Sequence, residues 1–574
     1  MQVTISRPKD ITTTHQQPRW RSYRLDTRWT SLILPVLIAL LVVIPLFTLV
    51  MELIPPSLDL WRRQWQNDTL PRMIEATLGL LIGVGVGTLI VGVGAAWLVT
   101  AYDFPGRRWF DRLLLLPLAV PTFVMGFVFM AIFDFSGPVQ SQLRVWFGTS
   151  DWFPQIRSLG GAIVVMTLVL YPYVYLLARA AFREQAAATF EASRVMGLSR
   201  TRTFFRLVLP MARPSIAAGA VLAMMEAMTD YGAVSFFSVP TLSEGIVRIW
   251  DVFYDRQTAT ELASFLLLFA LGMIFLERAL RGRAKYYQAG ARGRRFERVP
   301  LTGWGRYAAT GVLSTLLFAA FVLPLMQLIA WVIEEVNSPS PVGDWQAAFM
   351  PQVSTSVGLS LVTAGMVCLL ALIVAYGVRA NSIMGERKLP KFIARLVTLG
   401  YAMPGAVIAA GVLFFVAPID HRITDFAEAH LGRTDPTLLI SGTMMLLLYA
   451  YVVRFMAVGF NSVESSMEKI TPNMEHAART LGAKPWRVLW RVHFPLVSTG
   501  AAAGAVLVFV DVMKEIPATM MLRPFGLDTL ALSTYNLAHE AFWTAAAIPA
   551  LTILAVGLIP VLILMRIGDN GYKH

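Results

Sequence analysis

Residues 217–222 read Ala-Ala-Gly-Ala-Val-Leu, and residues 502–507 read the same six letters again 285 positions later. The same shift aligns charged residues, glycine and proline on both sides of this segment. The aligned pairs are Arg194 and Arg479, Gly197 and Gly482, Arg202 and Arg487, Arg206 and Arg491, Pro210 and Pro495, Glu226 and Asp511, and Asp230 and Glu515. Shared apolarity alone would not keep these residue types in register, so the sequence predicts an internal duplication.

The composition of the chain indicates a membrane protein. Of its 574 residues, 56% are hydrophobic and 15% are charged, whereas about 25% of residues are charged in soluble domains. The formal net charge of +13 comes from basic residues that lie between long uncharged segments, which favours a lipid surface over nucleic acid. Cys368 is the single cysteine, so internal disulfides and cysteine-based metal sites are excluded.

Twelve segments are long and apolar enough to cross a bilayer, which takes about 20 residues of helix. We predict spans at 30–51, 77–100, 113–133, 160–178, 214–236, 262–276, 307–333, 353–378, 396–417, 437–458, 497–519 and 543–565. Six spans per copy insert both copies the same way up. The expected fold class is therefore an all-α polytopic membrane protein with about twelve transmembrane helices in two parallel six-helix repeats.

The repeats divide the chain into four parts. These are an N-terminal tail (1–29), a first repeat (30–284), a basic linker (285–306) and a second repeat (307–574). The first span is longer than a signal-peptide core and no small-residue cleavage site follows it, so we expect a retained anchor. Lys and Arg are concentrated in the loops on the N-terminal side of the membrane, which predicts that both termini and the linker are cytoplasmic.

Two basic loops, 183–213 and 468–498, are the best-matched parts of the repeats. Each is expected to form a short helix, a sharp turn at glycine, and a second basic helix ended by proline. One such loop could equally be an amphipathic helix on lipid headgroups. Two copies with the same spacing from glycine to proline favour a docking element.

These loops resemble the signature loop of permease subunits of binding-protein-dependent ABC importers. In that family the loop forms a coupling helix that fits a groove on the ATPase subunit. The resemblance gives this role to Glu191, Ala192, Gly197 and Pro210 in the first repeat, and to Glu475, Ala477, Ala478, Gly482 and Pro495 in the second. Ser193 replaces the second alanine of the pattern, and His476 holds the usual glutamate position. The contacts of the two loops with the ATPase are therefore expected to differ in strength.

The resemblance also implies partners and a location. The chain has no Gly-x4-Gly-Lys-[Ser/Thr] phosphate loop, so we expect ATP and Mg²⁺ on two copies of a separate ATPase subunit. The chain itself is then not an enzyme and holds no cofactor. A bacterial inner membrane is implied, together with a periplasmic substrate-binding protein that docks on loops including 237–261 and 520–542.

Four acidic residues lie in predicted spans, where ionisable groups are costly and mark candidate sites. Glu226 and Asp230 are spaced to share one helix face, and Asp511 and Glu515 are their equivalents in the second repeat. A pseudo-twofold axis would bring both acidic faces to the centre of the protein. In the alternative interpretation, Glu226 and Asp511 pair with Lys514 or backbone amides, and Asp230 and Glu515 lie near the outer water.

Four acids favour a cationic cargo, and their hard oxygen ligands suit a metal ion held transiently by Glu226, Asp230, Asp511 and Glu515. The segments 230–235 (Asp-Tyr-Gly-Ala-Val-Ser) and 514–519 (Lys-Glu-Ile-Pro-Ala-Thr) are similar to segments of fused ferric-iron permeases. The likeness spans most of the chain and implies import of ferric iron. Thiamine, polyamine or phosphonate permeases and, from another class, an ion-coupled secondary transporter stay as alternatives.

Two weaker patterns are given structural interpretations. Tyr171, Tyr173 and Tyr175 are expected in an interfacial aromatic belt. Pro121 and Pro404 are expected to kink the third and ninth spans, with a gate as the alternative role.

Overall fold

The computed structural model describes most of the chain. The described residues are 23–52, 62, 65–184, 199–281, 298–340, 345–383, 388–431, 439–468, 470–483, 485–488, 491–492 and 494–570. Within them the chain is almost entirely helical, as the sequence predicts.

Twelve helical segments of the described part are long and apolar enough to cross a membrane, one for each predicted span. In the first repeat they are built from α1 (Tyr23–Glu52), α3 (Thr69–Ala101), α5 (Thr122–Phe133), α7 (Leu159–Glu184), α10 (Leu209–Thr229) and α13 (Arg256–Arg281). The third segment extends from Thr122 through α6 (Pro138–Phe147), and the fifth begins before α10, at Thr201. In the second they are built from α14 (Trp304–Leu317) with η4 (Phe318–Val322) and α15 (Leu323–Asn337), then α16 (Trp345–Ile383), α18 (Gly405–Leu431), α19 (Met444–Met467), α22 (Phe494–Met513) and α25 (Trp543–Asn570). The predicted all-α membrane fold is confirmed.

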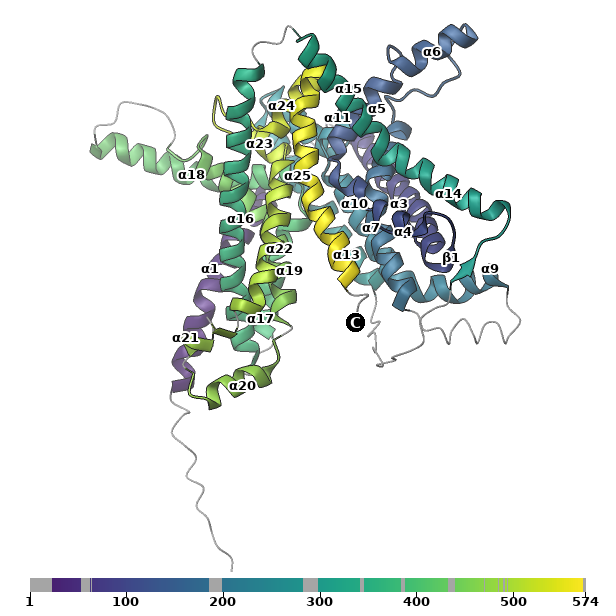
Figure 1. Ribbon diagram of the computed structural model, residues 1–574. Helices are drawn as coiled ribbons and strands as arrows, with labels where there is room; N and C mark the ends of the chain where they lie inside the picture. The colour runs from purple at the N-terminus through teal and green to yellow at the C-terminus, as the bar shows by residue number, and fades with distance from the viewer. Residues whose placement is uncertain are drawn as a thin grey trace, which may run out of the picture.

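Shorter elements join these helices. In the first repeat they are β1 (Tyr102–Asp103), α4 (Arg107–Leu113), η2 (Leu116–Ala119), α6 (Pro138–Phe147), α9 (Arg200–Thr203), η3 (Phe204–Val208), α11 (Gly232–Phe236) and α12 (Leu242–Asp251). Later in the chain they are β2 (Val299–Pro300), α17 (Lys388–Val397), η5 (Leu399–Ala402), α20 (Pro472–Thr480), α21 (Pro485–Val488), α23 (Pro517–Leu522) and α24 (Leu530–His539). Figure 1 shows α9, α20 and α21 at one end of the bundle, here called the loop face, and α6, α23 and α24 at the other, here called the far face.

The two repeats interlock through their first helices. α1 packs on α16 and α18 of the second repeat, where Tyr449 Oη donates a hydrogen bond to the carbonyl of Leu41 at 2.7 Å. In the opposite direction, α14 lies against α4 of the first repeat, and Figure 1 shows it crossing that side of the bundle. The sequence boundary between the repeats is therefore not the boundary between two separately packed bundles.

The linker before the second repeat is tied to the first. β2 pairs in parallel with β1, so that Tyr102 lies opposite Val299 and Asp103 opposite Pro300. Thr310 Oγ1 of α14 donates a hydrogen bond to the carbonyl of Pro105 at 3.0 Å. These contacts fix the start of the seventh span on the first repeat.

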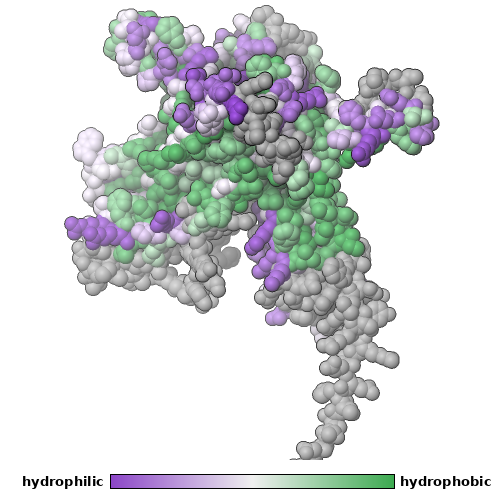
Figure 2. All heavy atoms as spheres, turned by 180° about the vertical axis from the view of Figure 1, so that it is seen from behind, coloured by the Kyte–Doolittle hydropathy of each residue, from purple (hydrophilic) through white to green (hydrophobic). Residues whose placement is uncertain are grey.

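The outer surface of the bundle has the pattern expected in a bilayer. Figure 2 shows hydrophobic side chains in a broad band across the molecule, with hydrophilic side chains gathered toward the far face. Large apolar side chains of the band, such as Ile90 and Phe275, are exposed. Exposure of such an apolar surface to water would cost free energy, whereas lipid tails cover it without that cost.

Four predictions about proline are wrong, and each for a geometric reason. Pro210 and Pro495 do not end helices but occupy the second position of α10 and α22. A π-helical turn over Phe204–Val208 precedes Pro210 and widens the helix where the proline ring would otherwise strike a backbone carbonyl. Pro121 and Pro404 do not kink spans, because each directly precedes the first residue of a helix, α5 or α18.

Candidate functional site

Helix α10 breaks at one of the predicted acids. It ends at Thr229, and Asp230 has an extended backbone (φ −78°, ψ 116°). Asp230 Oδ1 accepts a hydrogen bond from the backbone N–H of Ala233 at 2.8 Å, at the start of α11. A carboxylate in this place caps the next short helix, so the prediction that Glu226 and Asp230 share one helix face is wrong.

The second repeat has the same break 285 residues later. Helix α22 ends at Met513, and Glu515 Oε1 accepts a hydrogen bond from the backbone N–H of Ala518 at 3.1 Å, at the start of α23. The prediction of a shared face for Asp511 and Glu515 is therefore also wrong. The duplication extends to individual hydrogen bonds, because Ala233 and Ala518 are themselves related by the shift of 285.

One cavity of about 120 Å³ between the repeats brings the four acids together. Both breaks contribute to its lining. Its charged lining residues are Glu226, Asp230, Asp511 and Glu515, which are acidic, and Arg454 and Lys514, which are basic. With all six ionised, the described lining carries two more negative than positive charges.

The basic residues both belong to the second repeat. Arg454 Nη1 lies 2.7 Å from Glu515 Oε1, and Lys514 Nζ lies 3.0 Å from Asp511 Oδ1. The shift of 285 relates Arg454 to Val169, an uncharged residue of the cavity wall. The repeats therefore present equivalent acids in different electrostatic surroundings.

The first-repeat acids have neutral hydrogen-bond donors. Tyr173 Oη donates to Glu226 Oε1 at 3.3 Å, and Asp230 is held by the backbone of Ala233. Among the described residues, no ion pair joins Glu226 or Asp230 to a basic side chain. In the alternative interpretation, Lys514 pairs with Glu226 and Asp511, and in the structure it pairs with Asp511 but not with Glu226. Glu515 does not lie near outer water, because its side chain is 4% exposed and paired with Arg454.

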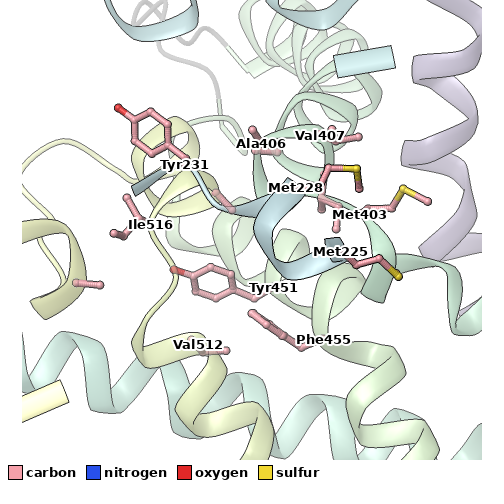
Figure 3. Close-up of a cluster of buried hydrophobic side chains, with 14 of the residues drawn as sticks. Met225, Met228, Tyr231, Met403, Ala406, Val407, Tyr451, Phe455, Val512 and Ile516 are labelled. Carbon is pink, nitrogen blue, oxygen red and sulfur yellow. The ribbon is translucent and has the colours of Figure 1, made fainter. Parts of the chain in front are cut away.

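Apolar side chains enclose the cavity region. Figure 3 shows the buried cluster at this interface, to which α10, α18, α19 and α22 contribute. Its labelled residues are Met225, Met228, Tyr231, Met403, Ala406, Val407, Tyr451, Phe455, Val512 and Ile516. Such surroundings strengthen the electrostatic interactions of the charged groups, because water is largely excluded.

A tyrosine pair joins the repeats next to the cavity. Tyr231 lines the cavity, and its Oη lies 2.8 Å from Oη of Tyr535 on α24. Tyr535 Oη also donates a hydrogen bond to Ser235 Oγ of α11 at 3.2 Å. Since α24 lies at the far face in Figure 1, these bonds hold the two repeats together on that side of the cavity.

The acids do not form a metal-chelating cage in this state. Among the residues that the structure describes, no three His, Cys, Asp or Glu side chains are close enough to share one metal ion. Ligation of one metal ion by three of these acids at once would therefore need a rearrangement of the cavity.

The second basic loop has the predicted helix and turn. Ala477 and Ala478 lie on α20, and the backbone N–H of Ala483 donates to the carbonyl of Ala478 at 3.0 Å. Gly482 has φ +79°, a left-handed conformation in which glycine is favoured at helix ends. Ala477 on α20 and Pro495 at the start of α22 are both exposed. Glu475 also lies on α20.

The first basic loop is described only in part. Glu191, Ala192 and Gly197 lie outside the described residues. Pro210 belongs to α10. The two phenylalanines that precede Pro210 have different surroundings. Phe204 packs on Trp97, with ring centroids 4.6 Å apart, whereas Phe205 is 60% exposed.

A half-buried ion cluster joins α4 to the C-terminal part of α7 beside this loop. Asp111 on α4 lies 2.8 Å from Arg179 and 2.7 Å from Arg183. Burial alone would raise the pKa of Asp111, but the two guanidinium groups outweigh burial and hold the pKa below its usual value. The predicted interfacial belt is wrong for Tyr171 and Tyr175, which are fully buried and donate to the backbone carbonyls of Leu114 and Asp111.

Arg454 is the cavity residue that sequence reasoning missed. It lies in the tenth predicted span, so the rule that marks intramembrane acids as candidate sites applies equally to this arginine. Tyr173 was missed for another reason, since three nearby tyrosines resemble a lipid-interface pattern and only the packing shows which one reaches the cavity.

The sequence matches the family described as binding-protein-dependent transport system inner membrane component twice, over residues 88–286 and 368–574. The chain belongs to this family. It is therefore a transporter component rather than an enzyme, and a multi-pass protein of the inner membrane. The two matches correspond to the two repeats, so this permease carries both halves in one chain.

Curated relatives include full-length and half-length proteins. The chain is 26% identical to the Fe(3+)-transport system permease protein FbpB 2 of Haemophilus influenzae, over 86% of this chain and 90% of the relative. It is 22% identical to the ferric transport system permease protein FbpB of Actinobacillus pleuropneumoniae, over 81% of this chain and 66% of the relative. The sulfate transport system permease protein CysT of Escherichia coli is 29% identical over 43% of this chain and 89% of its own length.

Proposed function

We propose that this chain is the membrane permease of an ATP-driven importer that moves ferric iron from a periplasmic binding protein to the cytoplasm. The observation that carries this proposal is the central cavity, where four acids face two basic residues between the repeats. The relatives that match most of this chain are named for Fe(3+) or ferric transport. An excess of carboxylate oxygen favours a hard cation as cargo.

In this proposal the cavity is the translocation site. Glu226 and Asp230 from the first repeat and Asp511 and Glu515 from the second supply oxygen ligands to the passing ion. Because the ion meets them only transiently, ligation is weak enough for release. Opening toward the binding protein requires loss of the Tyr231–Tyr535 contact, which closes the far-face side in the described state.

Coupling to ATP hydrolysis is assigned to the two basic loops. Glu475, Ala477, Ala478, Gly482 and Pro495 form one contact with an ATPase, and Glu191, Ala192, Gly197 and Pro210 form the other. Two ATPase copies hold the ATP and Mg²⁺, and this chain binds no cofactor. The loop face, where α1 begins and α25 ends (Figure 1), then lies in the cytoplasm with both termini.

An oxyanion is the second candidate cargo. Arg454 and Lys514 line the cavity, and half-length relatives are named as sulfate and molybdenum permeases. In the described state both cations are paired with carboxylates. A bound anion would have to displace those carboxylates, and for this reason the cation is preferred.

Uptake of labelled cargo by a strain that lacks this chain tests the proposal. Ferric iron, sulfate, molybdate, thiamine, a polyamine and a phosphonate are supplied in parallel, with and without the restored chain. We expect restored uptake of iron alone. Restored uptake of another compound, with iron unaffected, would keep the permease and overturn the iron assignment. Uptake that persists without the ATPase would favour an ion-coupled carrier.

A further inference from the structure

A short amphipathic helix, α6, projects from the far face and contacts α5. Helix α6 and its flanking turns, residues 134–158, are here called the aromatic arm. In Figure 1 the arm stands at one edge of the far face, away from α23 and α24. None of its residues lines the central cavity.

The arm is a built element with defined ends. Pro138 occupies the first turn of α6, and Gly148 ends the helix with φ +76°, the left-handed conformation that glycine adopts readily. Gln140 Nε2 donates to the carbonyl of Phe133 at 2.9 Å. Arg157 makes a two-pronged contact with Asp134, at 3.2 and 3.0 Å.

Several large apolar side chains of the arm point outward, while two of its polar side chains are buried. Gln140 and Ser150 are buried, and Arg144 donates to Ser150 Oγ at 3.2 Å while it lies over the ring of Phe135. The exposed large apolar residues are Phe135, Val145, Trp146, Phe147 and Trp152, each more than 60% exposed. This is the reverse of the arrangement expected for an arm surrounded by water.

We propose that the aromatic arm lies in the lipid headgroup region and anchors the far-face edge of the first repeat to the bilayer. Two tryptophans within seven residues favour this occupant, because the indole ring prefers the membrane–water interface. A short helix with large exposed apolar side chains at one end can lie in that region with its axis along the surface.

The position of the arm argues against a protein occupant. A binding protein that delivers cargo must cover the centre of the far face, whereas α6 lies at its edge (Figure 1). An apolar projection at the edge of the bundle fits the surrounding lipid.

Spin labelling of the full-length permease in lipid nanodiscs tests this proposal. Cys368, the single cysteine, is replaced by serine, and a nitroxide is attached to Trp146→Cys. Reference labels at Ile90→Cys, on the exposed apolar face of α3, and at Ala477→Cys, on α20, mark lipid and water. Collisions with oxygen, which concentrates in lipid, are compared with collisions with a water-soluble nickel chelate.

We expect the label at position 146 to collide with the nickel chelate several-fold less often than the label at Ala477. Its depth in the membrane should be shallower than that of the label at Ile90. Trp152→Cys provides a second label if the first variant assembles poorly. Nickel collisions equal to those at Ala477 in both arm variants would overturn the proposal. Nickel collisions that fall only after a binding protein is added would overturn it in favour of a protein surface.

Discussion

Arg454 Nη1 and Glu515 Oε1 lie 2.7 Å apart in the central cavity, with side chains 16% and 4% exposed. The shift of 285 that relates the repeats puts Val169 opposite Arg454 and Asp230 opposite Glu515, and all four residues line the cavity. Equivalent acids are thus neutralised in one repeat and held by neutral donors in the other. The cargo therefore meets an asymmetric site inside a duplicated framework.

The Arg454–Glu515 pair predicts a specific pattern of variant stability. Glu515→Gln leaves a buried guanidinium without its counter-charge, and Arg454→Gln leaves a buried carboxylate, so each is expected to cost about 3 kcal/mol. The double variant removes both charges and is expected to recover most of this loss. Thermal unfolding of the detergent-solubilised protein measures the effect. Additive losses in the double variant would show that the two charges do not depend on each other.

The first-repeat acid Glu226 is expected to matter for flux rather than stability. Glu226→Gln keeps the shape of the side chain and its contact with Tyr173 but removes a negative charge from the cavity. We expect iron uptake to fall by roughly tenfold or more, equal to ~1.4 kcal/mol, with an unchanged unfolding midpoint. Glu334→Gln, which alters an exposed acid on α15, is the matched control. Equal uptake by both variants would remove Glu226 from the pathway.

Gly482 is expected to be essential for coupling. Valine at this position must adopt φ near +79°, which disfavours the sharp turn by about 1–2 kcal/mol. We expect Gly482→Val to insert normally but to lose the stimulation of ATP hydrolysis by cargo. Gly442→Val is the control, since Gly442 has φ +77° and open space around it but lies outside the loop. Full stimulation in the Gly482 variant would exclude this turn from the coupling contact.

The Asp111 cluster predicts a pH-dependent stability. The folded pKa of Asp111 is lowered, so its contribution is present above the unfolded pKa of about 3.9 and is lost as pH falls through the folded pKa. Asp111→Asn should cost about 3 kcal/mol at neutral pH and progressively less in acid. Asp103→Asn alters an ion pair in which the Asp103 side chain is 65% exposed and the Arg107 side chain is 9% exposed, and because water solvates this carboxylate the cost should be smaller, about 1 kcal/mol or less. Equal unfolding midpoints for the two variants at pH 7 would contradict this role.

Periodicity and repeat register predict most of the fold. Helical membrane spans need only an apolar length, and the 285-residue shift follows from matched residues such as Gly197 and Gly482, so both were accessible from sequence. The interlocking of the repeats was not, because the contact of Tyr449 with Leu41 joins positions 408 residues apart. The apolar sequence of α1 is equally compatible with packing against lipid, against its own repeat or against the other repeat.

The candidate site was predictable in composition but not in geometry. A charge in an apolar span is visible in sequence, and this rule found Asp230 and Glu515. It gave the wrong local structure because a carboxylate that caps the next helix competes with helix continuation, and the cap forms only when a second short helix follows. The pairing of Lys514 with Asp511 rather than Glu226 likewise depends on packing between helices.

The central claim is that acids from both repeats carry a cationic cargo through one cavity. Its most direct test is ATP-driven uptake of labelled ferric iron into proteoliposomes that contain the permease, its ATPase and its binding protein. Wild-type permease is compared with the Glu226→Gln/Asp511→Asn variant, at matched protein levels and matched basal ATP hydrolysis. We predict that iron uptake falls by roughly tenfold or more in the variant. Uptake at the wild-type rate would contradict the claim.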